Sequence, residues 1–450
     1  MNKQEIRAAL AIAALFLVRM LGLFMILPVL PLIGAELRNS TPLLVGLALG
    51  IYGLSQAVLQ IPFGMASDYF SRKSVITFGL ILFIFGSLIA AVGDDIFTVI
   101  LGRFIQGCGA IASTLLALMS DVTRVDHRSK AMGIIGSAIG ISFGLSIVLG
   151  PIIFTYLGLS GIFIISAVLG TLGLIILGKL IPTPISIKTN LDTKVVLEKF
   201  WLMLCDQNLV PIYLGVFFLH YFLTSSFMVF PPMLREAGIG YEAHSFYYFG
   251  VFLISLFFMG PFVWLSDRQG KSARVMRGMI FFLIIAMIGL ANALSSLVIL
   301  AYMVVFFVGF NLLEMLLPAH MSRIVAAGTR GTGMGIYSTF QFLGTFVGGV
   351  LAGLLLTYAE ITALLYVNAS ICVVWLLLCR NLQSLNGIES RIIHLRTFDG
   401  MSANTILGCL LSVNGVVDAV LIEEERVAYL KIKSDLFDES QLQQFTKNKI

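Results

Sequence analysis

The chain is short of charge and of the residues that most enzymes use for chemistry. Only 12% of its 450 residues are Asp, Glu, Lys or Arg, whereas 58% are hydrophobic and 35 are Phe. A soluble domain could not bury so large a share of apolar side chains, so the composition predicts a protein that crosses a membrane many times. The net charge of +5 does not indicate a nucleic-acid partner, because the Lys and Arg residues are spread among the polar intervals.

Metal and nucleotide signatures are also missing. The five cysteines are scattered, with no CxxC pair and no His at the spacing of a metal site: Cys108, Cys205, Cys372, Cys379 and Cys409. The absence of a Walker motif favours an ion gradient over ATP as the source of energy. We therefore expect no metal, no cofactor and no enzymatic activity.

Long apolar runs fill most of the chain. About twelve are long enough to cross a bilayer, near residues 8–34, 43–66, 74–92, 96–119, 131–157, 161–181, 209–234, 244–266, 275–294, 297–320, 332–358 and 361–379. An even number places both ends of the membrane part on one side. The intervals on that side hold most of the basic residues, so this side and both termini are predicted to be cytoplasmic. The first run continues past Arg19 without a small-residue cleavage site and is interpreted as a membrane helix, not a signal peptide.

The membrane part contains a tandem repeat. The pairs Pro62-Phe63 and Ser67-Asp68 recur at one constant offset as Pro261-Phe262 and Ser266-Asp267, again between two apolar runs. Repetition in the same order indicates two halves related by an axis along the membrane normal.

After Cys379 the apolar runs end, and the alternation of a small soluble domain begins. We expect strands at 391–397, 416–422 and 427–433 and helices at 402–412 and 438–447. This order fits a ferredoxin-like unit whose last strand is missing or swapped. The expected organisation is a first six-helix half at 1–181, a cytoplasmic linker with an amphipathic helix at 182–208, a second half at 209–380 and a cytoplasmic domain at 391–450.

Several short motifs lie within or directly after particular apolar runs. They are the stretch from Gly64 to Lys73 after the second run, Gly22 with Pro28 and Pro31 in the first, Arg103 to Gly107 in the fourth, and Gly140, Gly144, Gly150 and Pro151 in the fifth. With these motifs the sequence resembles the major facilitator superfamily. The likeness is to its twelve-helix drug/proton antiporter branch, including bacterial inner-membrane transporters with a small C-terminal domain. In the fifth run, Phe154 and Thr155 stand where the family pattern has paired glycines.

The resemblance implies an all-α polytopic membrane protein with twelve transmembrane helices in two pseudo-symmetric halves, plus a small α+β ferredoxin-like C-terminal domain. It also implies a bacterial inner-membrane location and proton-coupled export of a small amphipathic compound or drug by alternating access. Two alternatives stay open: a proton-coupled importer of a small metabolite, and a membrane sensor whose output is the C-terminal domain.

Ionisable residues inside apolar runs are costly and are therefore candidates for function. Glu314 is the only carboxylate deep in a run, and an apolar site lets such a group hold or release a proton, so it is the favoured coupling residue. Alternatively, it pairs with an Arg or caps a helix. Arg103 resembles the family arginine proposed to act in proton transfer; its structural alternative is to hold helices together through carbonyls and Gln106. Arg19 is a candidate to meet an anionic substrate or to pair with Glu314.

Other polar residues in the apolar runs are weaker candidates for the interior. His220 is a candidate cavity residue, although a lone His is more often a packing residue. Amides at Gln56, Gln60, Asn311, Gln341 and Asn368 point to the interior, because an amide that faces lipid leaves its hydrogen bonds unmade. The rest of the cavity is expected to be apolar and aromatic, with Met228, Phe230, Tyr248, Phe307, Phe310, Tyr337 and Phe340 as candidates.

The stretch from Gly64 to Lys73 predicts a conformational latch. Asp121 ends the fourth run on the same side as Arg72 and is expected to bond it, while Asp68 is expected to meet the start of a helix in the other half. Such contacts would hold the outward-facing state. The alternative is plain anchoring of the loop.

The C-terminal domain resembles heavy-metal-associated domains at Asp399 to Met401. The metal-binding cysteines of that family would fall near Ala403 and Ile406, and neither is Cys, so metal binding is not expected. We expect this domain to bind a ligand, to regulate or to self-associate.

Overall fold

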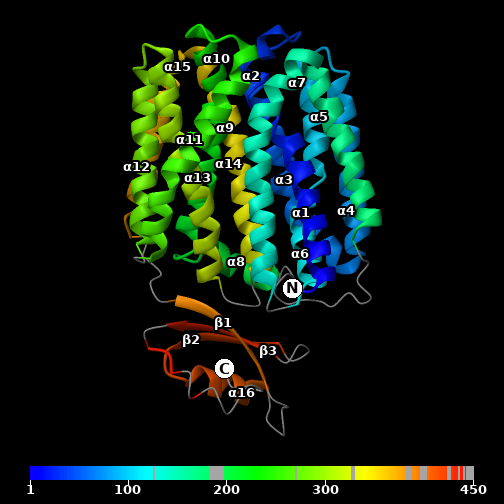
Figure 1. Ribbon diagram of the computed structural model, residues 1–450, viewed down its shortest axis with the longest axis vertical. Coiled ribbons are helices and arrows are strands. Elements are labelled where there is room, and N and C mark those ends of the chain that lie inside the picture. The colour runs from blue at the N-terminus through cyan, green and yellow to red at the C-terminus, as the bar shows by residue number, and fades with distance from the viewer. Residues whose placement is uncertain are drawn as a thin grey trace.

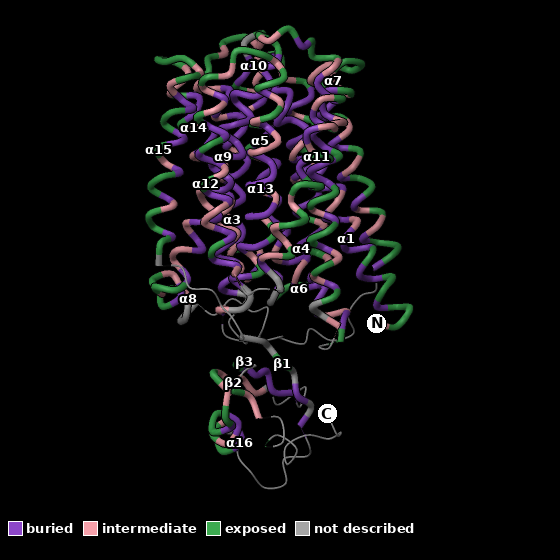
Figure 2. Tube along the Cα trace, turned by 60° about the vertical axis from the view of Figure 1, so that its left-hand side comes forward, coloured by how far each residue is buried: buried purple, intermediate pink, exposed green. Residues whose placement is uncertain are grey.

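The protein is described by a computed structural model that covers residues 1–124, 127–181, 197–268, 271–325, 330–381, 388–395, 403–422, 427–433, 436–438 and 441. A bundle of long, nearly parallel helices forms one part, and a small sheet hangs from one end of it (Figure 1). The end beside the sheet is called the domain face below, and the opposite end the distal face. Figure 2 shows that buried residues run through the middle of the bundle and that exposed ones lie around it.

Eleven helices of the described chain are long and apolar enough to cross a membrane, two of them interrupted. The helices of the bundle are α1 Lys3–Phe24, α3 Pro42–Tyr69, α4 Arg72–Ala91, α5 Ile96–Cys108, α6 Ala112–Val122, α7 Arg128–Lys179, α9 Val210–Phe227, α11 Tyr241–Arg268, α12 Ser272–Ala291, α13 Ser296–Ile324, α14 Arg330–Tyr358 and α15 Ile361–Leu378. Short elements lie at their ends: α2 Leu30–Ile33, η1 Gly34–Glu36, α8 Leu197–Leu204, α10 Phe230–Glu236 and η3 Cys379–Asn381.

The longest helix, α7, reverses direction at Gly158. Ser146 donates to the carbonyl of Leu21 at 3.3 Å, and Ser166 donates to the carbonyl of Gly22 at 3.5 Å. These two serines would lie about 30 Å apart on one continuous helix, so the chain must fold back between them. Gly158 makes the turn with φ +65°, a left-handed conformation that favours glycine. With α7 counted twice, the eleven helices give twelve crossings, which confirms the predicted number.

Glycines let α14 pack closely against both halves of the bundle. A Cβ on Gly50 of α3 would lie 2.7 Å from the carbonyl oxygen of Phe346, and Gly46 meets Gly349 backbone to backbone. On its other side, Gly348 of α14 packs directly on the backbone of Tyr221 in α9. Because no hydrophobic effect draws helices together in lipid, such small residues permit the close contact that holds them.

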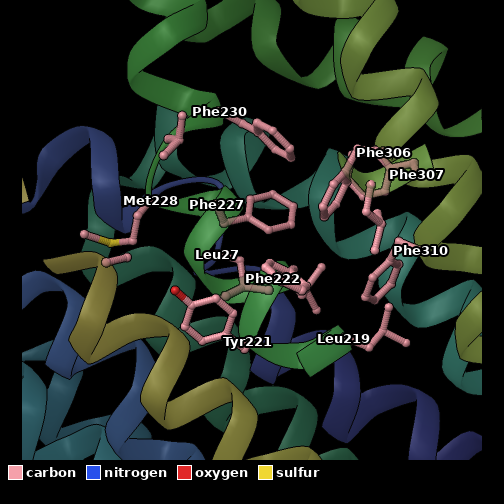
Figure 3. Close-up of a cluster of buried hydrophobic side chains, with 14 of the residues drawn as sticks. Leu27, Leu219, Tyr221, Phe222, Phe227, Met228, Phe230, Phe306, Phe307 and Phe310 are labelled. Atoms are coloured by element: carbon pink, nitrogen blue, oxygen red, sulfur yellow. The ribbon is translucent and has the colours of Figure 1, made fainter. Parts of the chain in front are cut away.

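A hydrophobic cluster joins the two halves in the distal part of the bundle. The ring of Phe143 in α7 lies 6.4 Å from that of Phe227 in α9 and 5.9 Å from that of Phe310 in α13. Figure 3 shows the rings of α9, α10 and α13 packed together, with Leu27 of the first half beside them. We expected Phe230, Phe307 and Phe310 to line a cavity. They are instead buried in this cluster.

Near the domain face the first half has a separate hydrophobic cluster of its own, to which α14 contributes only Phe342 and Leu343. There α7 has open space on one side: a Cβ on Gly133, Gly136 or Gly140 would meet no atom within 4 Å. The packed aromatic contact between the halves therefore begins near the middle of the bundle and continues toward the distal end.

The small domain contains a three-stranded antiparallel sheet and one described helix. The elements are β1 Ile388–His394, α16 Ala403–Leu411, β2 Val416–Ile422 and β3 Val427–Lys433, and the strand order is β1-β3-β2. The second and third strands have the predicted limits. The first was predicted at 391–397 and begins three residues earlier, because pairing with β3 runs from Ile388 opposite Lys433 to His394 opposite Val427. The predicted helix at 438–447 lies mostly outside the described residues, as do residues 182–196 of the predicted linker.

Candidate functional site

Two buried arginines of the first half meet at one tyrosine. The guanidinium carbon of Arg103 on α5 lies 4.9 Å from the centre of the Tyr52 ring on α3. Nη2 of Arg19 on α1 donates to the hydroxyl of the same tyrosine at 3.1 Å. Arg19 is 2% exposed and Arg103 is 1% exposed. Tyr52 thus connects two cations from different helices inside the bundle.

The remaining contacts of Arg103 lie within the first half. Its Nε donates to the carbonyl of Ala48 at 3.3 Å, and its Nη1 donates to Oε1 of Gln106 at 3.1 Å. Nε2 of Gln106 in turn donates to the hydroxyl of Ser87 on α4 at 2.7 Å. An arginine that holds helices together is expected to bond carbonyls and Gln106, and Arg103 makes both kinds of contact.

Arg19 fills a break in the fourth crossing. The helix α5 ends at Cys108 and α6 begins at Ala112, so the backbone is not helical halfway through this crossing. Nη2 of Arg19 donates to the carbonyl of Gly109 at 2.6 Å and to Oε1 of Gln56 at 2.7 Å. The same carbonyl also accepts from the backbone N–H of Ile111 at 2.9 Å, so the guanidinium adds a second hydrogen bond inside the break.

A second polar group lies in the other half, where three helices meet. Nε2 of His220 on α9 is 3.7 Å from Oε2 of Glu314 on α13 and 2.8 Å from Nε2 of Gln341 on α14. Nδ1 of His220 faces the carbonyl of Val216 at 3.2 Å and therefore carries a proton. With the Gln341 amide oriented as it is, Nε2 accepts its N–H, so His220 is neutral in this arrangement.

Glu314 is the accessible member of that group, since 35% of its side chain is exposed against 6% for His220. Glu314 is not joined to Arg19, whose hydrogen bonds to described residues all end on groups of the first half. The expected pair across the halves is thus absent among the described contacts of this conformation. Asn311, one turn before Glu314 on α13, donates from its Nδ2 to Ser255 of α11 at 3.2 Å.

The residues expected to form a latch meet at the domain face. Nε of Arg72 donates to Oδ2 of Asp121 at 3.1 Å, with 3% and 5% of the two side chains exposed. Nη1 of Arg72 also donates to Ser67 at 2.5 Å, and that hydroxyl donates to the carbonyl of Gly64 at 2.7 Å. Lys73 donates to the carbonyl of Ile181 at 2.5 Å. The Asp68 side chain lies outside the described part of the chain, so its expected contact with the other half stays a prediction.

The glycines of the fifth run differ in what surrounds them. Gly140 has open space, whereas a Cβ on Gly144 would lie 2.5 Å from the Phe252 ring of α11. Gly150 packs on the backbone of Met25, and Pro151 follows it inside α7. Two of these glycines therefore allow close packing of α7 on α11 and on the end of α1.

Tyr52 was missed in the sequence, although a signal was there. Tyr52, Gln56 and Gln60 are spaced four residues apart, which places three polar groups on one stripe of α3. Gln56 donates to Gln60 at 3.2 Å along this stripe. Among the described residues, no three His, Cys, Asp or Glu side chains lie where they could share a metal ion.

Comparison with known proteins shows a consistent set of relatives. A profile described as Major Facilitator Superfamily matches residues 12–325 and 212–384. The chain is 37% identical over 446 residues to the inner membrane transport protein YajR of Escherichia coli, covering 99% of this chain and 98% of that protein. It is 24% identical over 378 residues to the quinolone resistance protein NorA of Staphylococcus aureus, covering 79% and 90%. The solved nucleoside transporter NupG has the same fold, with a TM-score of 0.66 and 14% identity, over 83% of this chain and 99% of that one.

Proposed function

Because the chain belongs to the major facilitator superfamily and is a membrane transporter, we propose that it exports a small amphipathic compound in exchange for protons, by alternating access. The name of NorA supports export, since resistance to a drug is what outward transport provides. The name of YajR supports a location in the bacterial inner membrane.

The distribution of charge supports a cytoplasmic domain face. Helix ends there carry Arg7, Arg72, Lys73, Lys130, Arg274 and Arg277. The distal ends carry Glu36, Asp94, Asp95, Glu236, Glu242 and Glu360, with Arg38 and Arg235 as the basic residues there. The positive-inside rule then places the domain face, both termini and the small domain in the cytoplasm.

The observation that carries the proposal is the contact between Glu314, His220 and Gln341. The Glu314 side chain is 35% exposed, but its Oε2 is buried and lies 3.7 Å from an imidazole that contacts an amide of a third helix. Glu314 and His220 titrate together, so a proton taken up at this site belongs to both residues. When Glu314 ionises and His220 becomes charged, Nε2 must donate and the Gln341 amide must turn to accept. Protonation thus changes a contact between α9, α13 and α14, which is how it would bias the rocking of the halves.

The packing of this conformation also fits alternating access. The aromatic cluster that begins at Phe143 closes the bundle from its middle to the distal end, while α7 has open space near the domain face. We infer that this is the state closed to the outside. The opposite state must separate Phe143 from Phe227 and Phe310 and close the halves near Arg72.

Transport in proteoliposomes tests the proposal. Purified protein is given an imposed pH gradient and a panel of lipophilic cations, neutral drugs and organic anions. We expect the gradient to move at least one class against the proton flow, and Glu314→Gln to abolish this drive while binding persists. Glu360→Gln, which changes an exposed distal carboxylate, is the matched control and should transport normally. Movement in the same direction as protons would instead establish the importer.

A sensor role is the second candidate, because Lys431 of the small domain contacts the end of α13, the helix that carries Glu314. The same experiment separates the two functions. Flux by the purified chain without another protein rejects a pure sensor, and binding without flux favours it.

A further inference from the structure

Two arginines beside the break in the fourth crossing, Arg19 and Arg103, have no carboxylate partner among the described residues. The ion pairs of the described side chains involve neither Arg19 nor Arg103, and their hydrogen bonds end on neutral oxygens. Burying an uncompensated charge costs free energy, and two such charges at one tyrosine repel each other. A site of this kind is best balanced by a negative group from outside the chain.

Arg19 still has donors to offer. Its three hydrogen bonds all leave from Nη2, whereas Nε and Nη1 are buried without a partner. A guanidinium has donors on all three nitrogens, and a carboxylate can accept several of them at once. The Tyr52 hydroxyl, which already accepts from Arg19, can donate its own proton to the same anion.

The backbone adds to the positive character of this place. Ala112 begins α6, an eleven-residue helix, close to the Gly109 carbonyl that Arg19 binds. The start of a helix presents free N–H groups and a partial positive charge. In transporters, half-helix ends inside the membrane are a recurrent means of binding charged groups of the cargo.

The surroundings favour an organic ligand. Apolar side chains of the first half lie around the break, among them Phe16, Met20 and Ile111, and Phe342 of α14 joins them from the other half. When the halves move, these side chains would provide apolar surface for the body of an organic anion. Arg19 is 2% exposed, so the ligand enters only when the halves move.

We propose that Arg19, Tyr52 and the broken helix between Cys108 and Ala112 form the binding site for the charged group of the cargo, and that the cargo is a small organic anion such as a monocarboxylate with an apolar body. Arg103 supports the site as a positioning residue, by holding Tyr52 and adding positive charge. This inference rests on the proposed function in one respect: it assumes that the bound anion is the transported cargo. Binding itself is measured without a proton gradient.

Binding of matched probes to purified protein in nanodiscs tests the site. Benzoate and octanoate are compared with neutral benzamide, with benzylammonium and with potassium chloride, using calorimetry and the thermal unfolding midpoint. We expect the two carboxylates to bind at least about tenfold more tightly than benzamide or benzylammonium, because a charged hydrogen bond is stronger than a neutral one.

The variants locate the binding. Arg19→Gln should weaken carboxylate binding at least about tenfold, Arg19→Lys should keep part of it, and Tyr52→Phe should lose less than Arg19→Gln. Arg38→Gln, an exposed distal arginine, should bind normally. Arg19→Lys and Tyr52→Phe keep the test decisive if Arg19→Gln does not fold.

Three results would overturn the proposal: benzamide binding as well as benzoate, carboxylate binding that survives Arg19→Gln, or chloride matching the carboxylates in affinity. Glu314→Gln should still bind benzoate. If it binds and no proton-driven flux is found in the wild type, the anion site stands and the proposed transport cycle fails.

Discussion

Gly46 of α3 and Gly349 of α14 pack against each other reciprocally: a Cβ on either one would collide with the carbonyl oxygen of the other. This contact lies in the distal part of α3 and joins the two halves. A larger residue here should prevent the distal ends from closing. We expect Gly46→Leu to destabilise the closed distal state by about 1–3 kcal/mol, the usual cost of overpacking.

Spin-label distances between Arg38→Cys and Glu360→Cys, in a background with Cys205→Ser, measure this opening. The distribution should shift to longer distances in Gly46→Leu. Gly136→Leu on α7 is the control, because a Cβ there meets nothing within 4 Å. Equal distributions in both variants would show that the glycine contact does not control closure.

The buried pair of Arg72 and Asp121 gives a second prediction. Asp121→Leu removes one carboxylate partner of the buried Arg72 guanidinium, which should destabilise the protein by up to about 3–5 kcal/mol. Adding Arg72→Met removes the cation that has lost this partner and should restore most of that loss. Arg124 pairs with Glu5 but has 63% of its side chain exposed, and the 7% exposed Glu5 carboxylate keeps the N–H of Asn2, so Arg124→Ala should cost less, about 1 kcal/mol. Thermal unfolding in detergent compares the four proteins, and a double variant no more stable than Asp121→Leu would refute a buried ion pair.

Local patterns carried the prediction of the fold. The strands at 416–422 and 427–433 were found at their limits because alternation of side chains is a property of each strand alone. The twelve crossings followed from the length of the apolar runs, and even the reversal at Gly158 fell between two predicted stretches.

The candidate site could not be predicted as fully, because its contacts join residues far apart in the chain. The sequence indicates that Arg19 needs partners, but not that Tyr52 and the Gly109 carbonyl provide them instead of Glu314. The break at Gly109 arises inside an apolar run that looks continuous in the sequence. Likewise, an aromatic residue such as Phe307 has the same pattern whether it lines a cavity or closes the distal end.

Gln341 provides a test of proton coupling that leaves the carboxylate in place. Gln341→Leu removes the donor to Nε2 of His220, so the imidazole loses the partner that ties it to α14. We expect proton-driven flux to fall about tenfold, which corresponds to the loss of one buried hydrogen bond, while downhill flux continues. Asn311→Leu is the matched control, because Asn311 bonds Ser255 and not Glu314. Equal losses of driven and downhill flux would assign Gln341 to cargo binding instead.

Lys431 of β3 holds the end of the helix that carries Glu314. Its Nζ donates to the carbonyl of Ile324, the last residue of α13, where helix carbonyls have no partner inside the helix. Pro318 lies between the two positions and cannot donate to the carbonyl of Glu314 four residues earlier, so α13 is weakened there. The small domain therefore holds the segment beyond this weak point.

Lys431→Met should free that segment. Hydrogen exchange at residues 321–325 is expected to rise about fivefold, since a charged hydrogen bond to a helix end contributes about 1 kcal/mol. Lys433→Met is the control: Lys433 lies two residues on in the same strand, with its side chain exposed. Because α13 also carries Glu314, Lys431→Met should alter the rate of proton-driven flux, whereas Lys433→Met should not. Unchanged exchange in Lys431→Met would mean that the sheet does not restrain α13, and a flux change without an exchange change would require another route from the domain to the bundle.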